Sequence, residues 1–382
     1  MKKMRSRGRV VWRTLGVCVA ATLVLLVSPA LTHLRAASLL VRFTDPGATF
    51  AIADYSRYEV RESPAMVDGQ MRARIYAPRG VEHPTGIVLV HGVHRLGIDE
   101  PRLVRFARTI AATGVTVLTP ELDELCDYRI DPRSVDTIGN AARDLRIRLG
   151  VKSGVGVMGL SFAGGLSLIA AADARYAGDI AFVVAVGAHD DLSRVLRFFA
   201  TNAIENPDGT QTLMHAHDYG PLVLVYSHVE AFFPAADVAV ARDALRAWLW
   251  EYQETARAQA KGLSAASREK IEKLFAHDVS GISGEMLALI AREESVTRQV
   301  SPRTFLRDVH VPIYLLHGAG DSVIPPTETL WLAHDAAPGT VQDALVSKAI
   351  EHVEMSGAPS ARDKWALVDF MSDVLREADR ER

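Results

Sequence analysis

The fold of this chain is decided by the stretch Gly154-Val155-Gly156-Val157-Met158-Gly159-Leu160-Ser161-Phe162-Ala163-Gly164-Gly165. The apolar run from Val155 to Met158 is typical of a strand that is covered on both faces, and helix-forming residues continue from Leu166 to Ala172. We therefore expect Ser161 to lie in a sharp turn between a strand and a helix, with its hydroxyl at the edge of a sheet. An ordinary N-cap serine in a glycine-rich turn is the alternative.

Strands and helices alternate along much of the chain. The expected strands are, in chain order, Tyr58–Glu62, Met71–Tyr76, Gly86–Val90, Val115–Leu118, Val155–Met158, Ile180–Val186 and Val311–Leu316. Helices are expected over Pro101–Thr113 and Ser134–Leu149. An antiparallel pair joined at Asp68-Gly69 opens the series. The alternation that follows predicts an α/β fold with a mostly parallel, doubly wound sheet.

A long segment interrupts this alternation between the last two strands. It is rich in Ala, Leu, Arg, Trp and Glu from Ala235 to Ala260, and it has helical character again over Ala266–Phe275 and Ser283–Arg292. We expect a helical cap over 190–301, inserted after the sixth strand. The core would then comprise 57–189 and 302–382.

Two further residues with catalytic side chains follow late strands. Asp321 comes just after Val311–Leu316, and His352 follows a short strand near the C-terminus. A serine hydroxyl needs a base to remove its proton, and the base needs an acid to orient it. The carboxyl ends of parallel strands meet at one edge of a sheet, so these residues can converge on Ser161. The alternative acid is Asp190 or Asp191, after the preceding strand.

The chain resembles the α/β-hydrolase superfamily of serine hydrolases, which includes esterases, lipases and dienelactone hydrolases. The resemblance covers about Arg57–Gly187 and Arg303–Arg376, and the order Ser161, Asp321, His352 is the family's order of serine, acid and histidine. The family's motif is G-x-S-x-G, and here the last small position is alanine. The His-Gly pairs that end two strands, at His91 and His317, are expected to be structural.

The resemblance implies a role for each site residue. Ser161 would be the nucleophile, His352 the base and Asp321 the residue that orients His352. The backbone amides of Phe162 and Val93 would form the oxyanion hole. The implied reaction is cleavage of a carboxylic ester, or a related acyl bond, of a small-molecule substrate through an acyl-serine intermediate, without a cofactor or metal ion. Separately from the resemblance, the position of the cap after the sixth strand should place it over Ser161, where it would act as a lid that selects acyl groups by shape.

Other functions are compatible with the same catalytic residues. Serine peptidases, thioesterases and acyltransferases use the same triad, because a fold does not fix the substrate. A non-catalytic binding protein on a hydrolase fold is the alternative from another class.

Composition excludes several further classes of protein. The net charge of −3 and the absence of a Lys/Arg-rich stripe in the body of the chain argue against nucleic-acid binding. The two cysteines, Cys18 and Cys126, lie in such different contexts that we expect no disulfide. The sequence has neither the paired-Cys spacing nor the His-x-x-x-His spacing that is typical of a zinc site. The sequence predicts no particular oligomeric state.

The N-terminus has a pattern of its own. A basic flank over 1–14 precedes a mostly apolar segment over 15–35, which we expect to be a transmembrane anchor. A cleaved signal peptide is the alternative, because Ser28-Pro29-Ala30 offers small residues for cleavage. A linker over 36–56 would follow. Either interpretation places the catalytic body outside the cytoplasm, as a membrane-anchored or a secreted or periplasmic protein.

Overall fold

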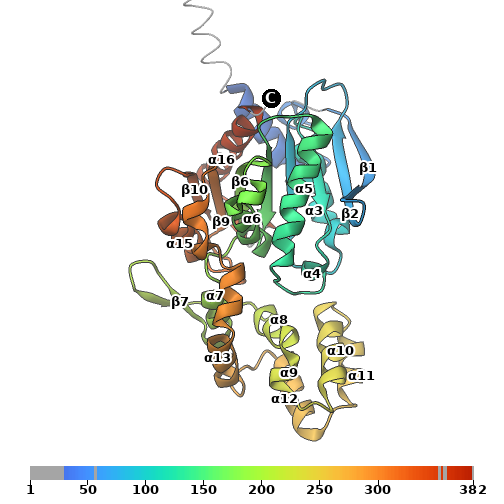
Figure 1. The fold of residues 1–382 in the computed structure, drawn as a ribbon, viewed down its shortest axis with the longest axis vertical. Coiled ribbons are helices and arrows are strands. Elements are labelled where there is room, and N and C mark those ends of the chain that lie inside the picture. Colours follow the sequence, from blue (N-terminus) through green and yellow to red (C-terminus); the bar gives the residue numbers. More distant parts are fainter. Residues whose placement is uncertain (1–29, 56–57, 352–353, 356–358, 381–382) are drawn as a thin grey trace, which may run out of the picture.

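A computed structural model describes residues 30–55, 58–351, 354–355 and 359–380. Their centre is an eight-stranded sheet in the order β1-β2-β4-β3-β5-β6-β9-β10 (Figure 1). Its strands are β1 (Val60–Val67), β2 (Met71–Pro78), β3 (Gly86–Val90), β4 (Thr116–Pro120), β5 (Val155–Leu160), β6 (Ile180–Val186), β9 (Ile313–Gly318) and β10 (Val341–Ser347). β2 pairs antiparallel with β1 and β4, and every other pairing in this sheet is parallel. The expected fold class is confirmed.

Helices cover both faces of the sheet. One face packs against α5 (Arg133–Leu149), α6 (Phe162–Ala172) and α15 (Thr327–Asp335), and the other against α3 (Pro101–Ala111) and α16 (Ala361–Arg380). Successive strand residues alternate between the two cores: Val88 lies in the first and Leu89 in the second, both fully buried. This two-sided burial explains the unbroken apolar runs of the central strands.

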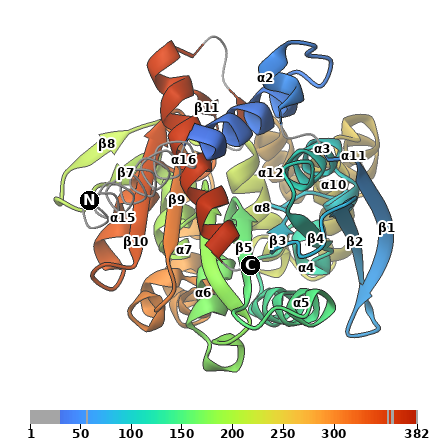
Figure 2. The ribbon, with the colours of Figure 1, turned by 90° about the horizontal axis from the view of Figure 1, so that it is seen from above.

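A helix over 30–44 lies on the second face. Its Arg35 pairs with Asp379 near the end of α16, Leu39 is buried, and the ring of Phe43 lies 5.0 Å from that of Phe106 on α3. Figure 2 shows this helix running from α16 toward the short helix α2 (Ala51–Asp54). The expected linker therefore includes a packed helix, because its apolar residues follow helical spacing and face the core.

The prediction of a membrane anchor is not tested by this helix. Most of the apolar segment, up to residue 29, lies outside the described residues. Within the part of the chain that the structure describes, no helix combines the length and the hydropathy needed to cross a bilayer.

The predicted cap follows β6 and lies beyond one end of the sheet (Figure 1). Its elements are α7 (Leu192–Thr201), β7 (Ala203–Glu205), β8 (Gln211–Leu213), α8 (Tyr219–Ser227), α9 (Val229–Phe232), α10 (Val238–Leu249), α11 (Gln253–Ala260), α12 (Ala265–Phe275), α13 (Ser283–Arg292) and α14 (Glu294–Thr297). The cap is helical except for the β7–β8 hairpin, which the sequence did not predict. The remaining short elements are α4 (Asp123–Cys126), β11 (Ile350–Glu351), β12 (Glu354–Met355), η1 (Gly97–Asp99), η2 (Ala174–Tyr176), η3 (Arg298–Val300), η4 (Pro302–Thr304) and η5 (Leu306–Asp308).

Candidate active site

Ser161 lies between the end of β5 and the start of α6, in a backbone conformation that non-glycine residues rarely adopt. Its φ is 57° and its ψ is −134°. Such a conformation costs on the order of 1–3 kcal/mol and persists only where the surrounding structure imposes it. Here the amide of Ser161 donates a 2.7 Å hydrogen bond to the carbonyl of Val186 on β6.

The turn requires glycine on both sides of the serine. A Cβ added to Gly159 would lie 2.4 Å from the carbonyl oxygen of Ala163, and one added to Gly164 would lie 2.7 Å from the Cβ of Ala188. Larger residues would force the strand and the helix apart. Alanine replaces glycine at the last small position of the motif. The side chain of this residue, Ala163, is fully buried in the packed turn, so the turn has room for its methyl group.

The loop after β3 passes directly beside Ser161. A Cβ on Gly92 would lie 3.2 Å from the Cβ of Ser161. His91 braces this loop: its Nδ1 lies 2.7 Å from the carbonyl oxygen of Gly92, and its Nε2 accepts a 3.0 Å hydrogen bond from the amide of Leu122. Burial lowers the pKa of His91 to about 4, so the ring is neutral and donates from Nδ1. His91 is thus a bracing residue, as expected.

The two predicted oxyanion donors are placed beside Ser161. Phe162 is the first residue of α6 and Val93 follows Gly92, and both residues line the same cavity as Ser161. Among the described residues, neither backbone amide has a hydrogen-bond acceptor. The first amide of a helix also lies at the positive end of the helix dipole. No described residue therefore competes for these two donors with an oxygen atom bound next to the serine.

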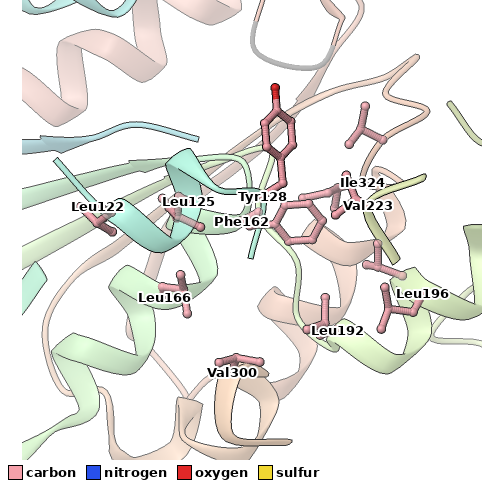
Figure 3. Close-up of a cluster of buried hydrophobic side chains, with 14 of the residues drawn as sticks. Leu122, Leu125, Tyr128, Phe162, Leu166, Leu192, Leu196, Val223, Val300 and Ile324 are labelled. Atoms are coloured by element: carbon pink, nitrogen blue, oxygen red, sulfur yellow. The ribbon is translucent and has the colours of Figure 1, made fainter. Parts of the chain in front are cut away.

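The side chain of Phe162 holds its backbone in place. The ring is 2% exposed and lies 5.3 Å from the ring of His189. Figure 3 draws it with Tyr128, Ile324 and Val223 in one buried hydrophobic cluster, to which both the core and the cap contribute. This packing fixes the position of the Phe162 amide relative to Ser161.

Asp321 lies just beyond β9 and is 1% exposed. Its Oδ1 accepts hydrogen bonds from the amides of Val323 at 2.9 Å and Ile324 at 3.0 Å. Its Oδ2 lies 3.3 Å from Nε2 of His317, whose Nδ1 lies 2.7 Å from the hydroxyl of Thr329. The carboxylate is therefore held in one orientation, and His317 belongs to the support of this loop.

The predicted base, His352, lies outside the described residues. The chain reaches it from β11, where Ile350 lines the same cavity as Ser161. The geometry of the base relative to Ser161 and Asp321 stays a prediction.

The alternative acids are engaged elsewhere. Asp190 pairs with Arg194 on α7 at 2.8 Å, and Asp191 pairs with Arg303 at 2.7 Å. Arg194 also pairs with Glu328 on α15 at 2.6 Å. Burial, followed by the nearby Glu328 carboxylate, raises the pKa of Asp190 to about 7. Neither aspartate lines the cavity beside Ser161. The Asp191–Arg303 and Arg194–Glu328 pairs connect the start of the cap to the core.

Ser161 is 4% exposed and faces a cavity of about 300 Å³ that is mostly apolar. Part of its wall comes from residues that the sequence analysis missed: Leu40 and Phe43 of the N-terminal helix, and His217 of the cap. The apolar positions 36, 39, 40 and 43 follow helical spacing and signalled a buried face. In the described part of the chain, no group of three or more His, Cys, Asp or Glu side chains could hold a metal ion.

Comparisons with known proteins concern the fold alone. No family model and no curated protein sequence matches this chain. Its structure is similar to that of a protein (lpg1103) from Legionella pneumophila described as a hydrolase, with a TM-score of 0.54, 12% sequence identity, and coverage of 90% of this chain and 94% of that chain. It is also similar to the structure of the rice cell wall degrading esterase LipA from Xanthomonas oryzae, with a TM-score of 0.53 and 14% sequence identity. That match covers 87% of this chain and 94% of the LipA chain.

Proposed function

The chain has the α/β-hydrolase fold, and on this premise we propose that it is a serine hydrolase that cleaves a carboxylic ester. In this proposal, Oγ of Ser161 attacks the carbonyl carbon while His352 takes the hydroxyl proton and returns it to the leaving alcohol. The serine then carries the acyl group. His352 next removes a proton from water, and the resulting hydroxide attacks the acyl carbon. The bond between that carbon and Oγ of Ser161 breaks, a carboxylic acid is released, and His352 returns the proton to Oγ.

The observation that best supports this proposal is the backbone conformation of Ser161. Its positive φ, at the joint of β5 and α6, is maintained although it costs free energy. An N-cap serine needs no such conformation, and Ser161 makes no capping hydrogen bond in the described structure. A strained serine supports a nucleophile better than a structural turn when it lies beside an apolar cavity and two amides for which the described residues offer no acceptor.

The surroundings of Ser161 favour an ester with an apolar acyl group. The carbonyl oxygen would bind the amides of Phe162 and Val93, and the developing negative charge would strengthen both hydrogen bonds in the transition state. Asp321 would orient His352 and stabilise its protonated form. The low exposure of Ser161 limits water around the reacting atoms.

Hydrolysis of p-nitrophenyl esters by the full-length protein tests the proposal. Ser161→Ala should lower kcat by at least about 10⁴, because residual catalysis over water comes from oxyanion binding alone. Ser153→Ala is the matched control, since Ser153 is exposed and precedes the same strand. Equal turnover in the Ser161→Ala variant and the wild type would contradict the proposal.

We also propose that the protein acts outside the cytoplasm and that its N-terminal apolar segment anchors or exports it. The basis is the sequence pattern of 1–35. Alkaline extraction of membranes, together with N-terminal sequencing, distinguishes the two forms. A retained anchor resists extraction and keeps the first residues, and a cleaved signal gives a new N-terminus near Leu31. A full-length protein found only in the soluble cytoplasmic fraction would contradict both.

A further inference from the structure

The cavity beside Ser161 extends along one face of the sheet. Its wall on the sheet side includes Met158, Val184 and Leu316, which belong to three neighbouring strands. All three lie in the second hydrophobic core, on the side of α3 and α16. The cavity is therefore a gap between the sheet and the helices that cover this face.

Three helices close the cavity opposite the sheet. Its lining includes Leu103 and Phe106 from α3, Leu367 and Met371 from α16, and Leu40 and Phe43 from the N-terminal helix. The N-terminal helix bridges the other two helices, which lie far apart in the sequence (Figure 2).

The N-terminal helix is held by polar contacts at one end and by aromatic packing at the other end. His33 Nε2 lies 3.0 Å from a carboxylate oxygen of Asp369 on α16, and Arg35 pairs with Asp379. Near the other end, the rings of Phe43 and Phe106 contact each other. Leu40 and Phe43 are thus held at fixed positions over the cavity.

The cap contributes little to this wall. Of the described lining residues, only His217 and Tyr219 belong to the cap. This differs from the expectation that a lid formed by the cap selects the acyl group. The physical reason is that the gap in packing lies along the sheet, under the N-terminal helix, whereas the cap lies beyond one end of the sheet.

We propose that this cavity binds the aliphatic acyl chain of the substrate and that Leu40 and Phe43 determine the chain length that is accepted. The inference rests on the proposed function and adds the substrate class: esters of fatty acids with chains longer than acetyl. Each methylene buried in the transition state raises kcat/KM about fourfold until the chain fills the cavity. Leu40 and Phe43 would determine specificity because they line the cavity in which the acyl chain would lie.

A Leu40→Trp substitution in the full-length protein tests the inference. The measured quantity is the ratio of kcat/KM for a long-chain p-nitrophenyl ester to that for the acetyl ester. A larger side chain fills the cavity, so the ratio should fall at least tenfold. Leu34→Trp is the matched control on the same helix, because Leu34 is 38% exposed and does not line the cavity. This variant should keep the wild-type ratio.

Phe43→Ala provides the opposite change. Removing the ring enlarges the cavity, so the longest ester that is hydrolysed efficiently should become longer by several methylenes. This variant keeps the inference testable if Leu40→Trp does not fold. An unchanged chain-length profile in a folded, active Phe43→Ala or Leu40→Trp protein would overturn the inference and leave the proposed function standing. Absence of ester hydrolysis in the wild type would overturn both.

Discussion

Gly92 approaches Ser161 so closely that a Cβ on Gly92 would lie 3.2 Å from the Cβ of Ser161. This contact sets the distance between the β3 loop and the nucleophile, and with it the position of the Val93 amide. The close approach leaves the loop little room to move toward the serine, and the hydrogen bonds of His91 to Gly92 and Leu122 hold the loop in place.

Gly92→Ala should therefore impair catalysis more than folding. The added methyl group pushes the loop away from Ser161, and loss of one oxyanion donor typically lowers kcat by about 10²–10³. We expect a fall in kcat approaching this range, with a thermal unfolding midpoint close to that of the wild type. Gly178→Ala is the control, because a Cβ at Gly178 meets no atom within 4 Å. Equal kcat values for the two variants would show that the loop does not position a donor.

The neutral state of His91 predicts a pH dependence of stability. The pKa of about 4 in the folded protein lies below the ordinary value of 6.5, so between these values the unfolded chain binds a proton that the folded protein does not. The stabilisation is complete above pH 6.5 and is lost as the pH falls from 6.5 to about 4. The loss amounts to about 3 kcal/mol.

His91→Gln should remove most of this pH dependence. A glutamine amide can donate to Gly92 and accept from Leu122, but it cannot take up a proton in this range. Denaturant unfolding at pH 4.5 and pH 7.5 gives the measurement. We expect the difference in unfolding free energy between the two pH values to be smaller in the variant. An unchanged difference would assign the acid sensitivity to other buried groups.

If Asp321 is the acid that orients His352, substitutions of Asp321 and Asp191 should have unequal effects on kcat. Asp321→Asn should lower kcat by about 10⁴, because the base would lose its orienting partner. Asp191→Asn removes a partner of Arg303 outside the cavity, so its effect should fall on the thermal unfolding midpoint rather than on kcat. Circular dichroism verifies that each variant is folded. A larger loss of kcat in Asp191→Asn would move the acid to the end of β6.

The sequence predicted those parts of the fold in which local pattern and tertiary environment agree. The central strands are buried on both faces, so their apolar runs were unambiguous, and β3 is buried at every position. The turn at Ser161 was predictable because glycine is needed where β5 and α6 approach each other. The position of Asp321 just beyond a buried strand was predicted from the apolar run that precedes it, and its role as the acid stays a prediction.

The N-terminal helix was missed because its partners are distant in sequence. Arg35 pairs with a residue 344 positions later, and neither sequence segment indicates the other. The apolar positions around Leu39 have helical spacing, but they directly follow a strongly apolar segment, which favoured an anchor followed by a linker. The cavity was also unpredictable, since a gap in packing depends on how three helices meet the sheet.

Labelling with a fluorophosphonate, followed by mass spectrometry of the labelled peptide, tests whether Ser161 is an activated nucleophile. The probe phosphonylates a serine only where a base activates the hydroxyl and donors bind the phosphoryl oxygen. We expect one adduct, on Ser161, which is absent from Ser161→Ala and strongly reduced in His352→Ala. An adduct on another serine, or labelling that persists in Ser161→Ala, would contradict this expectation.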